Sequence, residues 1–232
     1  MHKLREIFTI LGKNYGKQGW WPLSKGNLET RHHNGKPESD KDRFEIMVGA
    51  ILTQNTSWTN VEKAIFNLNE AKLLDFKKMA AAKESEIAEL IRPAGYYNQK
   101  AKRLKLLAKY FIDNPNLLNK NVKELRIELL SLNGIGPETA DSIILYAAEK
   151  PSFVIDAYTK RIFSRLFGKN FGDYNNWKAF FESELKSDVK TFNEYHALIV
   201  KHAKKYCKSK PECNNCALLV NCSYQKWHSG KL

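Results

Sequence analysis

Four cysteines near the C-terminal end are the residues whose spacing most directly predicts chemistry. They are Cys207, Cys213, Cys216 and Cys222. The pattern C-x5-C-x2-C-x5-C spans sixteen residues, and the first 206 residues contain no cysteine. Thiols this close in a reducing compartment can converge on one soft metal centre. Structural zinc favours two C-x2-C pairs, whereas one short pair between two longer loops suits a cubane cluster at least as well. The spacing predicts a metal centre and leaves a 4Fe–4S cluster and zinc both open.

A second motif, Leu132-Asn-Gly-Ile-Gly-Pro-Glu-Thr-Ala-Asp141, predicts a tight turn between two helices. Gly134 and Gly136 permit positive φ angles, and Pro137 suits the first turn of the next helix. Exposed N–H groups at such a turn can bind a phosphate without reading base sequence. A plain helix–helix turn is the alternative, and the basic charge of the chain favours the phosphate-binding hairpin. Its candidate contact residues are Gly134, Ile135, Gly136 and Glu138.

The charge of the chain indicates a polyanionic partner. The 232 residues include 38 Lys+Arg against 25 Asp+Glu, a net charge of +13, and 43% are apolar, which excludes wholesale disorder. Nucleic acid is the default partner of so basic a protein. No run of about eighteen uncharged apolar residues predicts a membrane span. Residues 1–5 lack the apolar core of a signal peptide, so a cytoplasmic location is expected.

Helical periodicity dominates the chain and predicts an all-α fold. The expected helices cover residues 44–52, 61–68, 101–111, 125–132, 139–148, 157–167 and 192–206. Only Pro151–Ile155 resembles a strand, and it has no second strand to pair with. The basic residues around the third helix are expected to form a solvated face. They are Lys100, Lys102, Arg103 and Lys105.

In chain order, these pieces resemble the endonuclease III superfamily of DNA glycosylases, which pair a helix-hairpin-helix with a downstream catalytic aspartate. The resemblance rests on Leu132–Gly136 followed by Ala140, on Val154-Ile-Asp156 and on the terminal cysteines. Ala50–Thr56 is also similar to the family's early helix and wedge loop. Because the order covers nearly the whole chain, the resemblance favours a 4Fe–4S cluster, with zinc as the alternative.

The cysteine loop departs from the family pattern in one respect. The familiar spacing has one more residue between the first two cysteines than this chain has. The shortened loop still carries Lys208 and Lys210. The resemblance implies that these two lysines contact the DNA backbone.

Glu138 departs from the family pattern at a position that decides the reaction. In bifunctional members, a lysine at this place attacks the sugar and forms a Schiff base that leads to strand cleavage. Glu138 lies eighteen residues before Asp156, which is the family's offset. A carboxylate cannot form an imine. The resemblance therefore implies a monofunctional DNA N-glycosylase without AP lyase activity, unless another lysine substitutes. A carboxylate in a first helical turn also suits the helix dipole.

Asp156 is the candidate catalytic residue. It stands directly before an expected helix, where aspartate is common as an N-cap in any helical protein. Cleaving a base from deoxyribose builds positive charge on the sugar, which a carboxylate can stabilise while it orients or deprotonates water. The resemblance favours the catalytic interpretation, and one residue can serve both purposes.

Aromatic residues are the candidates for binding a flipped base. Aromatic faces suit such a base, and a cationic alkylated purine gains cation–π attraction. Core packing is the alternative for any single tryptophan. Residues 20–22, 49–56 and 92–103 resemble the 3-methyladenine DNA glycosylase branch, which implies a base pocket. Its expected lining is Trp20, Trp21, Pro22 and Trp58. Gln54 or Asn55 is expected to fill the gap that the flipped nucleotide leaves, or to cap the following helix.

The resemblance also implies a two-lobed helix-hairpin-helix glycosylase fold with a C-terminal four-cysteine cluster. Residues 40–149 are expected to form a helical barrel lobe, and residues 1–39 and 150–232 a second lobe with the catalytic aspartate and the cluster loop. We expect a monomer, associated with the nucleoid, that removes alkylated purines such as 3-methyladenine from damaged double-stranded DNA. The alternatives are a bifunctional glycosylase/AP lyase for oxidised pyrimidines and a non-catalytic DNA-binding iron–sulfur module.

Overall fold

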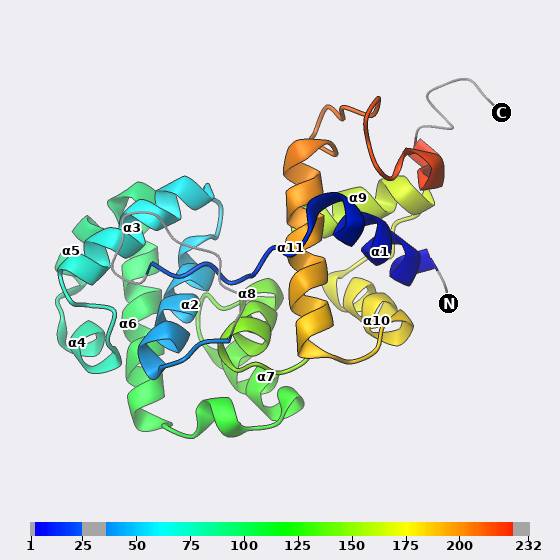
Figure 1. The fold of residues 1–232 in the computed structure, drawn as a ribbon. Helices are drawn as coiled ribbons and strands as arrows, with labels where there is room; N and C mark the ends of the chain where they lie inside the picture. The colour runs from blue at the N-terminus through cyan, green and yellow to red at the C-terminus, as the bar shows by residue number, and fades with distance from the viewer. Residues whose placement is uncertain (1–2, 25–35, 225–232) are drawn as a thin grey trace. The chain divides into compact units, whose positions relative to one another are not determined.

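The computed structural model describes residues 3–24 and 36–224, and these residues form helices and turns without a β-strand (Figure 1). The all-α prediction is confirmed. The helices are α1 (Lys3–Tyr15), α2 (Asp40–Leu52), α3 (Trp58–Glu70), α4 (Phe76–Ala81), α5 (Glu84–Leu90), α6 (Tyr97–Asp113), α7 (Val122–Ser131), α8 (Pro137–Ser142), α9 (Ala157–Phe167), α10 (Tyr174–Glu184) and α11 (Val189–Lys205). None of them is long and apolar enough to cross a bilayer.

The chain divides into two compact units. Unit 1 comprises residues 1–19 and 151–232, and unit 2 comprises residues 20–150. Residues 20–39 were expected in the second lobe instead. Residues 20–24 belong to unit 2 because the Ser24 N–H and hydroxyl donate to the buried Glu45 carboxylate, at 2.5 and 2.8 Å. The indole of Trp21 also packs against Gly49, where an added Cβ would lie 3.1 Å from the ring.

Helix α2 is the central helix of unit 2. Every residue from Phe44 to Leu52 is buried, and α2 packs against α3, α6 and α8. Its first turn is capped by Ser39, whose side chain accepts a hydrogen bond from the Asp42 N–H at 3.1 Å. A helix that is apolar on all sides has to be enclosed, which explains this position.

The predicted helix over residues 139–148 is not regular. Helix α8 ends at Ser142 and continues as a single π turn, Ile143–Ala147. The Arg43 guanidinium donates to the Ala147 carbonyl and to the Glu149 carboxylate just beyond this turn. π turns are frequent at functional sites because they change the direction of side chains. This one carries Tyr146.

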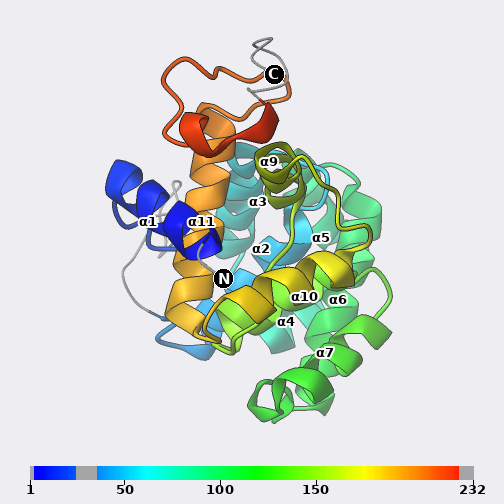
Figure 2. The ribbon, with the colours of Figure 1, turned by 90° about the vertical axis from the view of Figure 1, so that its right-hand side faces the viewer.

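Unit 1 is built around α11, against which α1 and α9 pack (Figures 1 and 2). The Tyr195 hydroxyl on α11 donates to the Leu4 carbonyl on α1 at 2.8 Å. Phe153 stacks on Phe181 of α10 with ring centroids 4.4 Å apart. Residues 151–155 form neither helix nor strand, and the Phe153 N–H donates to Glu182 at 2.8 Å. These contacts fix the chain that leads into α9.

Candidate functional site

The glycine motif forms a hairpin between α7 and α8 in unit 2, which confirms the predicted turn. Gly134 has a φ of +85°, and an added Cβ would lie 2.1 Å from Arg103 Nε, so only glycine fits. Gly136 is the N-cap of α8 at a φ of −87°, so the expected need for a positive φ does not apply to it. The Ile135 side chain is buried, whereas Glu138 is exposed in the first turn of α8.

A buried ion pair holds the two helices of the hairpin together. Arg126 on α7 donates to both carboxylate oxygens of Asp141 on α8, at 2.9 and 3.3 Å. The Asp141 side chain is fully buried. A two-point pair between a guanidinium and a carboxylate fixes orientation as well as distance. The hairpin is therefore a rigid platform.

Gln54 braces the loop between α2 and α3 against the hairpin. Its Nε2 donates to the Gly134 carbonyl at 3.1 Å and to Thr139 Oγ1 at 2.9 Å. Arg103 Nη1 donates to Gln54 Oε1 at 2.6 Å. Asn55 is exposed in the left-handed region with a φ of 54°. Gln54 and Asn55 were both expected to fill a gap in DNA. Both Nε2 and Oε1 of Gln54 are already hydrogen-bonded within unit 2, whereas Asn55 is exposed.

Lys100 corrects the prediction of a solvated basic face. Its side chain is 1% exposed, and Nζ donates to the carbonyls of Leu52, Gln54 and Ala94 at 2.8, 2.7 and 2.9 Å. Burial lowers its pKa to about 8, and Arg103 contributes. The reason for the error is that the C-terminal carbonyls of α2 need donors, which Lys100 supplies. Helical periodicity does not reveal this role.

Four aromatic side chains of unit 2 form one cluster: Trp20, Trp21, Trp58 and Tyr146. The Trp21 ring centroid lies 5.5 Å from Trp58, 5.2 Å from Tyr146 and 6.0 Å from Trp20. Trp21 and Pro22 are buried, whereas Trp20 and Trp58 are partly exposed. Tyr146 was not among the expected pocket residues, because residues 143–147 resemble an ordinary core helix in sequence. The partly exposed members of the cluster are therefore Trp20 and Trp58.

Asp156 of unit 1 is the N-cap of α9. Its Oδ1 accepts hydrogen bonds from the Thr159 N–H and hydroxyl, both at 2.7 Å. Its Oδ2 lies 3.5 Å from Nε2 of His196 on α11. Burial would raise the pKa of Asp156, but His196 and the Thr159 donors together lower it below the ordinary value. The capping interpretation is confirmed, and the side chain is a buried carboxylate held ionised.

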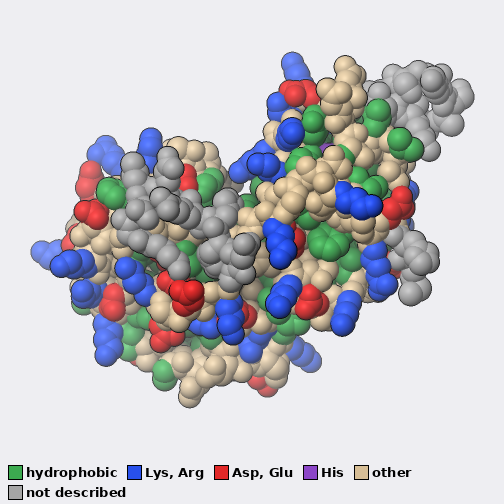
Figure 3. All heavy atoms as spheres, viewed as in Figure 1, with side chains coloured by type: hydrophobic (Ala, Val, Ile, Leu, Met, Phe, Trp, Pro, Cys, Tyr) green, Lys and Arg blue, Asp and Glu red, His purple; other side chains and the backbone are tan. Residues whose placement is uncertain are grey.

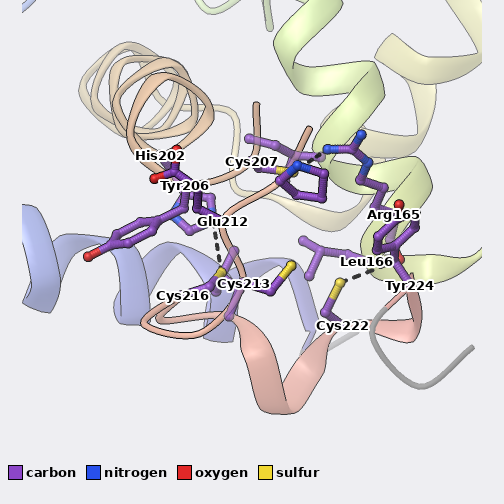
Figure 4. Close-up of a pocket in the computed structure, with 13 residues that line it drawn as sticks. Arg165, Leu166, His202, Tyr206, Cys207, Glu212, Cys213, Cys216, Cys222 and Tyr224 are labelled. Carbon is purple, nitrogen blue, oxygen red and sulfur yellow. Dashed lines mark hydrogen bonds between the residues drawn. The ribbon is translucent and has the colours of Figure 1, made fainter. Parts of the chain in front are cut away.

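The four cysteines line one pocket in unit 1 (Figure 4). All four are free thiols. Within residues 3–24 and 36–224, no three His, Cys, Asp or Glu side chains are placed to bind a single metal ion. Burial raises the pKa of Cys216 to about 11, and Cys207, Cys213 and Cys222 add to this effect. Metal binding would replace these protons, and four soft sulfur donors around one pocket fit a thiolate-bound centre.

Two side-chain nitrogens lie close to cysteine sulfurs of this pocket. His202 Nε2 lies 3.5 Å from Cys216 Sγ, and the Tyr15 hydroxyl lies 2.8 Å from His202 Nδ1. Burial lowers the pKa of His202 to about 4 and raises the pKa of Tyr15, so both side chains are neutral. Arg165 Nη1 lies 3.3 Å from Cys207 Sγ. Such donors stabilise thiolate ligands.

The cysteine loop also presents basic side chains. Lys208 and Lys210 are exposed, and Lys208 Nζ lies 2.6 Å from Glu212. Arg165 donates to the carbonyls of Lys208 and Ser209 at 2.6 and 2.8 Å, which fixes the shortened loop. Lys and Arg side chains are spread over the face shown in Figure 3, with acidic side chains between them.

A family model described as "HhH-GPD superfamily base excision DNA repair protein" matches residues 48–184. A Methanocaldococcus jannaschii protein with the provisional name DNA repair glycosylase MJ1434 is 47% identical over 224 residues, which are 94% of each chain. Residues 48–184, which the family model matches, contain the hairpin, Trp58 and Asp156.

Two solved structures share the fold. The 3-methyladenine DNA glycosylase MagIII of H. pylori, bound to 1,N6-ethenoadenine, has a TM-score of 0.69 and 29% identity, with 87% of this chain and 97% of that chain covered. A trapped endonuclease III–DNA covalent intermediate has a TM-score of 0.77 and 22% identity, with 98% of each chain covered.

Proposed function

Because this chain belongs to the HhH-GPD superfamily of base excision DNA repair proteins, we propose that it is a monofunctional DNA glycosylase. It hydrolyses the N-glycosidic bond of a damaged base in double-stranded DNA and leaves the sugar–phosphate strand intact. The observation that carries the monofunctional assignment is Glu138, exposed in the first turn of α8 where an amine nucleophile would be required. A carboxylate there cannot form an imine with the sugar.

Asp156 is the proposed catalytic residue. Its Oδ1 is occupied by the Thr159 donors, and its Oδ2 takes no part in the cap. As the glycosidic bond breaks, positive charge develops on the sugar, and an ionised carboxylate stabilises it. The same carboxylate accepts the proton of the attacking water, so that the new C–O bond forms as the water loses its proton. The low pKa of Asp156 keeps the carboxylate ionised at neutral pH, which charge stabilisation requires.

An alkylated purine such as 3-methyladenine is the proposed substrate base. Trp20 and Trp58 offer partly exposed indole faces in one aromatic cluster, and a cationic base gains stacking and cation–π attraction from them. Alkylation also weakens the glycosidic bond, so a pocket with little base-specific hydrogen bonding suffices. The name and ligand of the MagIII structure support the same substrate class.

Base release from a panel of damaged DNA tests this function. Duplexes carrying methylated purines, oxidised pyrimidines or uracil are incubated with the protein, and free bases are measured directly. Strand breaks are scored with and without alkali. We expect release of methylated purines, with breaks only after alkali. Exclusive release of oxidised pyrimidines would overturn the substrate assignment, and no release from any duplex would favour the non-catalytic DNA-binding module.

Borohydride should trap no covalent complex between the protein and lesion DNA. Glu138 cannot supply the amine that borohydride reduction of an imine requires. The measurement is a denaturing gel of protein, lesion duplex and borohydride, beside a reaction without borohydride. A lesion-dependent shifted band would identify a different lysine as nucleophile and favour the bifunctional alternative. Endonuclease III, whose structure as a trapped covalent DNA intermediate shares this fold, is the positive control on the same gel.

Replacing Trp58 by alanine should reduce release of the alkylated base. Loss of one stacking partner costs about 1–3 kcal/mol in binding or transition-state stabilisation. Trp58 begins α3 and is partly exposed, so thermal stability should change less than activity. Trp58→Phe is the matched control, because it keeps an aromatic face and should retain most of the rate. Parallel losses of melting temperature and activity in both variants would assign Trp58 to the core instead.

A 4Fe–4S cluster is the proposed occupant of the cysteine pocket, with zinc as the alternative. Its ligands are Cys207, Cys213, Cys216 and Cys222. The Arg165 guanidinium, which donates to the Cys207 sulfur, supports an anionic centre. The cluster would hold residues 207–222 in place and so present Lys208 and Lys210 to DNA.

The remaining DNA contacts are proposed to be independent of base sequence. The backbone of Gly134–Gly136 binds a phosphate, and Asn55 fills the gap left by the flipped nucleotide. Gln54 positions both elements through its bonds to Gly134 and Thr139. We further propose that the protein acts as a monomer associated with the nucleoid.

A further inference from the structure

The geometry points to His196 as a positioning residue for Asp156, an inference that rests on the proposed glycosylase function. His196 lies on α11, and its Nε2 is 3.5 Å from Asp156 Oδ2. We propose that this imidazole directs an N–H at Oδ2, keeps the carboxylate ionised and fixes the oxygen that faces the reacting sugar and water. The sequence carries no motif that marks His196, which is forty residues from Asp156.

The two oxygens of Asp156 have different surroundings. Oδ1 accepts both Thr159 donors at 2.7 Å, which is a complete N-cap. A cap needs only one oxygen, so His196 at Oδ2 is not explained by capping. In a site without substrate, catalytic hydrogen bonds are often long and shorten when the complex forms. The separation of 3.5 Å is consistent with a contact of this kind.

Because the Asp156 carboxylate is buried, it needs a partner to stay ionised. The side chains of Asp156 and His196 are 12% and 6% exposed. An isolated carboxylate at this depth would become protonated, and a neutral acid cannot balance charge on the sugar. His196 opposes this effect, together with the Thr159 donors. Thr159 comes from α9 and His196 from α11, so both helices that pack around Asp156 contribute.

The position of His196 is itself fixed by the core. The preceding residue, Tyr195, is fully buried and donates to the Leu4 carbonyl at 2.8 Å. Helix α11 begins at a cap in which Asp188 accepts from the Thr191 N–H and hydroxyl. Helix α9 packs directly against α11. These contacts fix the backbone from which the His196 side chain reaches Asp156.

Two substitutions of His196 test the proposal. His196→Leu removes the N–H, and His196→Gln keeps one on a side chain of similar reach. Single-turnover base release is measured from pH 4 to 9 on the duplex of the panel from which wild type releases its base fastest. Affinity for an abasic-analogue duplex is measured separately. In His196→Leu the acid limb should move up by about 1 pH unit, as expected when a hydrogen-bond donor to a buried carboxylate is removed. Its rate should fall at least about tenfold, with DNA affinity unchanged, whereas His196→Gln should recover most of the rate.

Two outcomes would overturn the positioning role of His196. A wild-type rate and pH profile in His196→Leu overturns the proposal. Equal losses in the Leu and Gln variants, matched by lower melting temperatures, assign His196 to packing and overturn it too. If His196→Leu does not fold, His196→Phe, an aromatic side chain without an N–H, is measured instead, and a wild-type rate and pH profile in that variant overturns the proposal in the same way. Asp156→Asn in the same assay separates the catalytic role of Asp156 from the positioning role of His196. A normal rate in Asp156→Asn refutes the catalytic assignment. An inactive Asp156→Asn together with a normal His196→Leu refutes only the role of His196.

Discussion

Replacing Asp156 by asparagine should reduce single-turnover base release by about 10²–10⁴-fold, the range associated with losing a general base. The amide is neutral and can neither balance the developing sugar charge nor accept a proton from water. Asparagine is as good an N-cap as aspartate, so its Oδ1 should still accept from Thr159 and α9 should keep its first turn. Removing the negative charge should leave affinity for DNA unchanged or raise it. The measurements are rapid-quench base release, melting temperature and a binding titration.

Asp188→Asn is the matched control for this variant. Asp188 caps α11 with the same pattern, accepting from the Thr191 N–H and hydroxyl at 2.8 and 2.7 Å. Its pKa is likewise lowered, chiefly by the Thr191 donors. The two substitutions therefore make the same chemical change at equivalent caps. If both variants, or neither, lose base release, then Asp156 serves only as a cap.

The parts of the fold that were predictable are those with local causes. Helix α9 was predicted at its observed bounds, because an aspartate cap, an apolar stripe and a following glycine delimit it. The cap at Asp156 and the hairpin turn were predictable for the same reason. The tight turn at Gly134 follows from the residue types of a ten-residue segment.

The parts that were not predictable depend on residues distant in the chain. Lys100 appeared to belong to a basic face, but its partners include carbonyls of the α2 terminus, almost fifty residues earlier. His196 reaches Asp156 from another helix, and Tyr146 owes its direction to a π turn. Arg103 covers Gly134, so a surface arginine became a packing element. Periodicity describes which face of a helix is apolar, not which carbonyl or carboxylate that face will meet.

Two helices of unit 1 connect the cysteine pocket to Asp156. Helix α9 begins at Asp156, and in its last turn Arg165 approaches the sulfur of Cys207 at 3.3 Å. Helix α11 carries His196 beside Asp156 and His202 beside Cys216. The proposed cluster and the proposed catalytic carboxylate therefore share the same two rigid elements. Loss of the cluster should consequently affect more than the loop that it organises.

Cys213→Ser should abolish binding of the metal centre and release the segment from Cys207 to Cys222. Leu218 is the only buried side chain in that segment, so apolar packing alone cannot hold it. Structural metal sites contribute on the order of 10 kcal/mol to the folding of small domains, and one lost ligand removes most of this. We expect wild type to be yellow-brown with about four iron and four sulfide per chain. The variant should lose colour and iron, melt earlier and be cleaved by proteases within this segment.

Asn214→Ser controls for the new side chain, because Asn214 is exposed in the same turn and is not a proposed ligand. It should keep the iron content, the visible absorbance and the melting temperature of wild type. Stoichiometric zinc without visible absorbance in the wild-type protein would replace the iron–sulfur assignment by the zinc alternative. A Cys213→Ser protein as stable as wild type would show that the thiols hold no structural metal. In the expected case, slower base release by the variant should accompany loss of the cluster, because α9 and α11 anchor both the pocket and Asp156.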